Sequence, residues 1–135
     1  MRALCLALAL ALAACDGAAP AAVAEPADAE GRAVTFLRHH VFDDPAALAD
    51  RFTPGAQPAD FPLRLLVDQP GELAFVDVWR VRSLDGRVVV EALITLRGKP
   101  HLQALWLSQQ GGVWRIDGWS PRPTPVDPGK PAPSA

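Results

Sequence analysis

Residues 73–97 read LAFVDVWRVRSLDGRVVVEALITLR, and this stretch decides the fold. Apolar and polar residues alternate over 73–84 and again over 87–97, and β-branched residues are frequent, as in half-buried strands. Asp85-Gly86 lies between the two runs, and Asp-Gly in a two-residue loop favours a type I′ turn. The stretch therefore predicts a β-hairpin.

The turn also predicts the register of this hairpin, because it sets Leu84 opposite Arg87. Counting back puts apolar side chains together on one face and opposite charges, which are favourable across strands, on the other. The expected pairs are Phe75 with Leu96, Trp79 with Ala92, Val81 with Val90 and, on the charged face, Arg80 with Glu91. The other arginines expected on the charged face are Arg82, Arg97 and Arg115.

Two more strands are predicted after the hairpin, over residues 101–109 and 113–119. Gly98-Lys99-Pro100 and Gly111-Gly112 supply the turns that precede them. The side chains expected to pack together from these strands are Leu105, Leu107, Trp114 and Ile116. The C-terminal half of the chain thus predicts an antiparallel meander of about four strands.

Three short helices are predicted before the meander. Ala33, Leu37 and Val41 recur at helical spacing. Asp44-Pro45 combines a favourable N-cap residue with a proline in the first turn, which predicts a second helix that ends near residue 52. A third short helix is expected over about residues 61–67.

Helices followed by a meander favour an α+β domain over about residues 30–120, with the helices packed on one face of a curved antiparallel sheet. The sheet region closes with GGVWRIDGW at 111–119. In its order of elements and in this ending, the chain resembles the nuclear transport factor 2-like (cystatin-like) superfamily from about residue 31 to 120. That superfamily includes small bacterial lipoproteins of unknown function. Its isomerases and cyclases place acidic residues inside a cone formed by the sheet.

The N-terminus carries a specific motif. Arg2 precedes an apolar run, and Leu12-Ala13-Ala14-Cys15 follows it, which is the order of a secretory signal. The run over residues 3–14 is too short to cross a bilayer, which takes about 20 residues. The four residues resemble the lipobox of bacterial lipoproteins, which implies removal of residues 1–14 and lipidation of Cys15. A cleaved signal peptide without lipid is the alternative.

This resemblance implies a location in the bacterial cell envelope, with the domain facing the periplasm on a lipid anchor. Asp16 resembles the inner-membrane retention signal of enteric lipoproteins, so the inner membrane is slightly favoured over the outer. Residues 15–29 predict a flexible Ala/Pro linker behind the lipidated cysteine. Residues 121–135 contain six prolines and predict a disordered tail.

Charge and cysteine content narrow the function classes. The net charge is −2, and removal of residues 1–14, which contain Arg2 and no acidic residue, changes it to −3. Nucleic-acid-binding domains typically present a clustered basic face, so no nucleic acid is expected as a partner.

Cys5 lies in the leader and Cys15 is expected to carry lipid. No cysteine then remains for a disulfide, and packing must stabilise the domain.

Asp77 is a weak candidate for catalysis. Alternation places it on the apolar face with Phe75 and Trp79, where burial would raise the pKa of its carboxyl. Related isomerases and cyclases usually add a Tyr or a His–Asp pair, and this chain has no Tyr. The alternatives for Asp77 are a place at the sheet rim, a partner among Arg or backbone groups, or a bulge. We therefore expect no catalytic residue.

Three tryptophans are candidates for binding. Trp106 and Trp119 are expected on the strand face opposite Leu107 and Ile116, where they and Trp79 would line a ligand or partner surface. Equally, these side chains would serve to cover the edge of the sheet.

His39 and His40 each have an Asp four residues further on, a grouping that metal sites use. Adjacent residues on a helix, however, point about 100° apart. We therefore expect structural or solvated histidines and no metal site.

The sequence predicts a membrane-anchored, non-enzymatic module without a cofactor, which binds an envelope protein partner or a small apolar ligand. One alternative is a small isomerase, cyclase or dehydratase that uses Asp77. Another is a structural subunit of the envelope.

Overall fold

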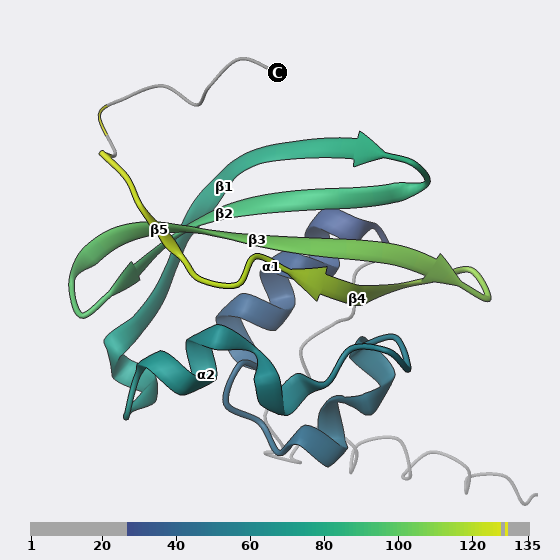
Figure 1. Ribbon diagram of the computed structural model, residues 1–135, viewed down its shortest axis with the longest axis horizontal. Helices are drawn as coiled ribbons and strands as arrows, with labels where there is room; N and C mark the ends of the chain where they lie inside the picture. Colours follow the sequence, from purple (N-terminus) through teal and green to yellow (C-terminus); the bar gives the residue numbers. More distant parts are fainter. Residues whose placement is uncertain (1–26, 128, 130–135) are drawn as a thin grey trace, which may run out of the picture.

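The computed structural model describes residues 27–127 and 129, so Cys15, the leader and most of the predicted linker lie outside the described residues. The described chain forms a curved antiparallel sheet with its helices packed on one side, which confirms the predicted α+β class (Figure 1). Across these residues, no helix has the length and apolar character that a membrane crossing requires.

Four long strands form the predicted meander, and each pairs antiparallel with the next. The strands are β1 (Leu73–Leu84), β2 (Arg87–Leu96), β3 (Lys99–Gln110), β4 (Val113–Trp119) and a short β5 (Thr124–Pro125). The predicted ends of β1 and β4 are confirmed, and β3 begins two residues earlier than predicted.

Two-residue turns with positive φ at both residues join these strands. Asp85 and Gly86 have φ of 49° and 79°, which confirms the predicted type I′ geometry of the first hairpin. The turn between β2 and β3 is Arg97-Gly98, with φ of 51° and 79°, rather than the predicted Gly98-Lys99-Pro100. Gly111-Gly112 makes the third turn.

The helices are short, and aspartates cap the first two of them. Asp28 precedes α1 (Ala29–His39), and its side chain accepts a hydrogen bond from Gly31 N at 3.3 Å. Asp44 caps the second helix as predicted, with 2.9 Å from its Oδ1 to Ala46 N. The remaining elements are the 3₁₀ helices η1 (Pro45–Arg51), η2 (Pro58–Asp60) and η3 (Pro70–Glu72), and the α-helix α2 (Pro62–Leu66).

Side chains of the protein itself fill the inner face of the sheet, defined here as the side that the helices cover. Its residues Val90, Ala92, Ile94, Leu105, Leu107 and Ile116 are 2% exposed or less. Phe36 of α1 meets the rings of Phe52 and Phe61 edge-on, at centroid distances of 5.3 and 5.2 Å. A hollow between Phe36 and Trp114 measures only about 10 Å³. The concave side thus holds a packed aromatic core, and Trp114 packs against it as predicted.

Two β-bulges change the register of the first hairpin. Near its turn the register is as predicted, with the pairs Leu84–Arg87, Val81–Val90 and Arg80–Glu91. Bulges after Phe75 and after Val78 then each insert one extra residue into β1. Phe75 consequently lies opposite Ile94, and Val78 lies opposite Ala92. The predicted partners of Phe75 and Trp79 were wrong, because each extra residue shifts the strand against its neighbour.

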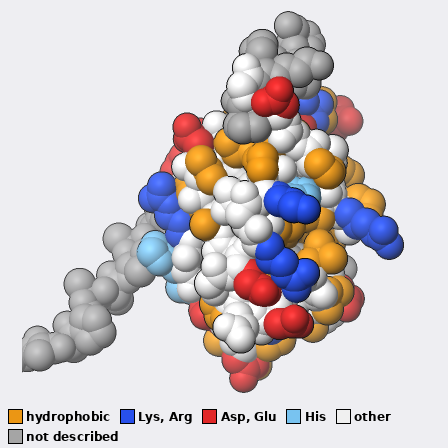
Figure 2. Space-filling view, turned by 90° about the vertical axis from the view of Figure 1, so that its left-hand side faces the viewer, with side chains coloured by type: hydrophobic (Ala, Val, Ile, Leu, Met, Phe, Trp, Pro, Cys, Tyr) orange, Lys and Arg blue, Asp and Glu red, His pale blue; other side chains and the backbone are white. Residues whose placement is uncertain are grey.

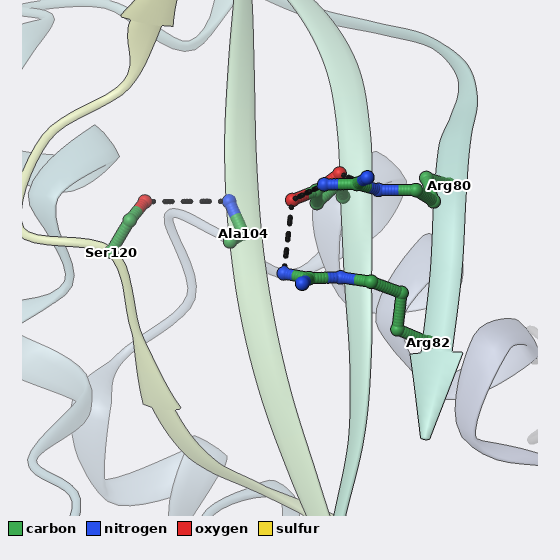
Figure 3. A network of polar contacts seen from close by, with 5 residues as sticks. Arg80, Arg82, Ala104 and Ser120 are labelled. Carbon is green, nitrogen blue, oxygen red and sulfur yellow. Dashed lines mark hydrogen bonds and ion pairs between the residues drawn. The ribbon is translucent and has the colours of Figure 1, made fainter. Parts of the chain in front are cut away.

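The sheet continues beyond residue 120. After β4, Thr124 and Pro125 pair with the start of β3, so the prediction of disorder was wrong for this part of the tail. Ser120 joins the two segments: its N donates to Ala104 O at 3.1 Å, and its Oγ accepts from Ala104 N at 3.4 Å (Figure 3). The buried Gln103 also donates to Ser120 Oγ, at 2.9 Å. As a result, β4 and β5 lie along the same edge of β3.

Candidate functional site

Asp77 lies on the exposed side of β1. The bulge after Phe75 sets it opposite Leu93, whereas Ile94 belongs to the inner face. Its Oδ1 accepts a hydrogen bond from Val78 N at 2.8 Å. The predicted place of Asp77 on the apolar face was wrong. Two of the alternatives describe its position, since it lies at a bulge and has a backbone partner.

Trp106 and Trp119, predicted on one face, lie on opposite faces. A bulge opposite Trp106 and Leu107 leaves Asp117 as an extra residue in β4. Trp119 therefore faces the core, where its ring meets Phe52 and Phe61 at 6.1 and 5.5 Å. The prediction failed because one inserted residue moves the next side chain to the other face.

Trp106 remains on the outer face, where it is 40% exposed. Its ring covers Gly118, where an added Cβ would come within 3.3 Å of Trp106 Cε3. Trp79 sits at the second bulge of β1, partly buried and outside the core cluster. The three tryptophans therefore do not form the single binding surface that the sequence predicts.

Charged side chains cover part of the outer face, as predicted. Arg80 contacts Glu91 through Nε at 2.7 Å and Nη2 at 3.0 Å, and Arg82 Nη2 lies 3.3 Å from the same carboxylate (Figure 3). The hydrogen bond with Glu91 raises the pKa of Arg80. The three residues form an ion-pair network between β1 and β2 on the outer face.

The ring of His40 is held between two charged side chains, Asp43 and Arg51. Helix α1 ends at His39, so the spacing of four residues between His40 and Asp44 does not bring the two together on one helical turn. Instead, His40 Nδ1 lies 2.7 Å from Asp43 Oδ2, and Arg51 Nη2 lies 3.1 Å from its Nε2. Since Arg51 donates to Nε2, the ring proton lies on Nδ1. The described residues contain no group of three or more His, Cys, Asp or Glu arranged to hold a metal.

A pocket of about 390 Å³ opens at the end of the sheet where β2 turns into β3. We call it the basic pocket, and its lining is Leu66, Val67, Leu96, Arg97, Lys99, His101, Arg122 and Pro123. Half of these side chains are basic and the other half are apolar. Figure 2 shows this end of the molecule, with Lys and Arg side chains standing among hydrophobic ones. The volume lies in the usual range of small-molecule sites, about 300–1,000 Å³.

Arg97 is the basic side chain of this pocket that has acidic partners. Its Nη2 lies 3.6 Å from Asp68 Oδ2, and its Nε lies 3.3 Å from Glu72 Oε1. Within residues 27–127, neither Lys99 nor Arg122 forms an ion pair with a carboxylate. The pocket therefore carries positive charge that the surrounding carboxylates do not neutralise.

The backbone of Arg97 is held in a left-handed conformation, with φ of 51°, which non-glycine residues rarely adopt. Its N donates to Glu72 O at 2.7 Å, so the turn is bound to η3. Glu72 in turn accepts from Asp68 N at 2.8 Å. This hydrogen bond from the backbone of Asp68, followed by the one from the Arg97 side chain, lowers the pKa of the Glu72 carboxyl. These contacts fix the turn at the mouth of the pocket.

Two other surface hollows are lined by fewer cationic side chains than the basic pocket. One of about 500 Å³ lies between η1 and η2, and Arg115 is its single charged side chain. Another, of about 400 Å³, lies on the outer face beside Trp106 and Arg87. Arg87 there is paired with Asp117 at 2.9 Å. The basic pocket alone among these three combines several cations with an apolar floor.

Sequence analysis missed the basic pocket because its lining comes from separated segments. Arg97 was expected on the outer face with Glu91, and Arg122 in a disordered tail. Both predictions were wrong, since Arg97 turns toward Glu72 and β5 brings Arg122 back to the sheet. In comparisons with protein-family models, curated proteins and solved structures, nothing matches this chain.

Proposed function

We propose that the protein is a lipid-anchored lipoprotein of the bacterial cell envelope whose domain is a non-enzymatic binding module. The anchor is Cys15, directly after the lipobox-like Leu12-Ala13-Ala14. The domain faces the periplasm, and Asp16 favours the inner membrane. Two or three acyl chains on one residue make a stable anchor, because each buried methylene contributes about 0.8 kcal/mol.

The observation that carries the binding role is the basic pocket. It is concave, it joins apolar and charged groups, and Lys99 and Arg122 within it lack acidic partners among the described residues. Apolar side chains with a few charged groups around a concave site are typical of a pocket that binds a ligand. The volume of the pocket suits a small molecule rather than the extended surface of a protein partner.

The fold assignment within this proposal is the nuclear transport factor 2-like superfamily. Helices that precede a curved antiparallel meander support it. In this protein the space inside the cone is taken by Phe36, Phe52, Phe61 and Trp119. The proposed ligand site consequently lies at the rim of the cone and not in its interior.

Binding is favoured over catalysis by the position of Asp77. An acid or base of this fold would act from the apolar interior, where burial shifts its pKa. Asp77 is exposed and bonded to the neighbouring backbone. The filled inner face leaves about 10 Å³ beside Phe36, too little to hold a substrate.

Mass spectrometry of the protein extracted from bacterial membranes tests both parts of the proposal. Under denaturing conditions, we expect a chain that begins at Cys15 and carries two or three acyl groups. Under native conditions, we expect an additional small-molecule mass that denaturation removes. Cys15→Ser is the control and should leave the leader in place. An unmodified residue 15 in the mature wild-type chain would contradict the anchor, and no added native mass would contradict the binding role.

A further inference from the structure

The charge of the basic pocket selects the kind of ligand. Arg97, Lys99 and Arg122 bring three cations together, whereas Asp68 and Glu72, the carboxylates that contact this group, both contact Arg97. The excess is positive although the whole chain has a net charge of −2. A local field of this sign attracts an anion and repels a cation. The ligand that fits therefore carries a negative group.

The apolar part of the pocket extends onto the surface. Helix α2 buries Leu63 completely and leaves the next apolar residues, Leu65 and Leu66, 71% and 43% exposed. Leu66 also lines the pocket, together with Leu96. Leu66 therefore adds exposed apolar surface to the lining of the pocket, and Leu65, the preceding residue of α2, is exposed too. Hydrocarbon placed over these two leucines, called here the exposed strip, would remove their side chains from water.

The geometry points to an anionic amphiphile as the ligand of the basic pocket: a phosphate or carboxylate head that carries a hydrocarbon chain. Lys99 and Arg122 hold the head, and the chain lies over Leu66 and Leu65. This inference rests on the proposed function and names its ligand class. At about 390 Å³ the pocket holds a head group and a short stretch of chain, so a long chain continues over the exposed strip.

Such a ligand has two sources, an amphiphile in solution and a lipid of the bilayer. The fourteen residues from Cys15 to Asp28 span at most about 50 Å when fully extended. That reach allows the pocket of an anchored domain to face the membrane surface. Both sources share the same chemistry, an anionic head beside hydrocarbon.

Titration calorimetry on residues 16–135 tests the ligand class, because the described core and the side chains packed against it lie within residues 29–119. The probes are octyl phosphate, octyl glucoside and inorganic phosphate, which separate the charge of the head from the chain. We expect octyl phosphate to bind at least about tenfold more tightly than either of the others, since only this probe uses both halves of the pocket.

Variants of exposed residues locate the site. The double variant Lys99→Gln/Arg122→Gln should weaken octyl phosphate binding at least about tenfold. Arg122→Lys, which keeps the charge, should largely retain it. Leu65→Ser/Leu66→Ser should weaken octyl phosphate and leave inorganic phosphate unchanged. Arg38→Gln removes the same charge from an exposed position that does not line the pocket, and it should bind as the wild type does.

Sedimentation with vesicles distinguishes the sources. Binding to phosphatidylglycerol vesicles but not to phosphatidylcholine vesicles would assign the ligand to the bilayer, and binding of octyl phosphate alone would assign it to solution.

Three results would overturn the inference: equal affinity for octyl phosphate and octyl glucoside, wild-type affinity in the Lys99→Gln/Arg122→Gln variant, or tighter binding of a hexaglutamate peptide than of octyl phosphate. In each of these cases a different ligand detected by native mass spectrometry would leave the broader proposal of a binding module standing.

Discussion

Replacing each of two tryptophans by alanine tests the bulge in β4, which turns Trp119 into the core and leaves Trp106 outside. Trp119 makes edge-to-face contacts with Phe52 and Phe61 at 6.1 and 5.5 Å. Contacts of this kind contribute about 0.5–1.5 kcal/mol each beyond the area they bury. Trp→Ala in a packed core costs about 3–5 kcal/mol. Because Trp119 is partly buried and packs against the core from its margin, we expect Trp119→Ala to lower the free energy of unfolding by about 2–4 kcal/mol.

Trp106→Ala is the matched control, because it removes the same side chain from the outer face. Trp106 is 40% exposed and covers Gly118, so we expect a loss of about 1–2 kcal/mol. Urea denaturation of residues 16–135, followed by circular dichroism, measures both values. If the two variants lost the same free energy, or if Trp106→Ala lost more, the bulge would not separate the two side chains and the reasoning would fail.

Two further predictions concern single residues of the turns. Gly112→Ala should lower the free energy of unfolding by about 1–2 kcal/mol, because φ of 80° is costly for a residue with a Cβ. Gly71→Ala is the control: an added Cβ there meets nothing within 4 Å, so the free energy of unfolding should change by less than about 0.5 kcal/mol. Equal losses in the two variants would be inconsistent with this reasoning. The contacts that lower the pKa of the Glu72 carboxyl stabilise the fold. This stabilisation is fully present at pH values above the ordinary pKa of 4.5, and it is lost as the pH falls through the lowered pKa. Urea titrations at pH 7, 5 and 3 should therefore show a smaller loss of stability on acidification in Glu72→Gln than in the wild type, and an unchanged pH dependence would argue against the contact.

Local sequence signals predict the elements of this fold well. Alternation places β1 at residues 73–84, and Asp85-Gly86 fixes both the type of the turn and the register beside it. Asp44-Pro45 predicts the start of a helix correctly, although the helix is 3₁₀. These features depend on residues within a few positions of one another, so the sequence displays them directly.

Bulges and the candidate site depend on contacts between distant segments. An extra residue such as Asp117 leaves alternation intact on both sides while reversing the face of every residue beyond it. For this reason Trp119 was placed on the wrong face. The basic pocket likewise forms only when Arg122 returns beside the β2–β3 turn. A proline-rich segment gives no sign that it will pair with a strand.

The most direct test of the account is to map where an anionic amphiphile binds, by nuclear magnetic resonance of residues 16–135 titrated with octyl phosphate. We predict that the amide shifts of Val67, Lys99 and Arg122 change most and that the shifts of Phe36 and Phe52 stay constant. Changes centred on Phe36 and Phe52 would place the ligand inside the cone and contradict a site at its rim.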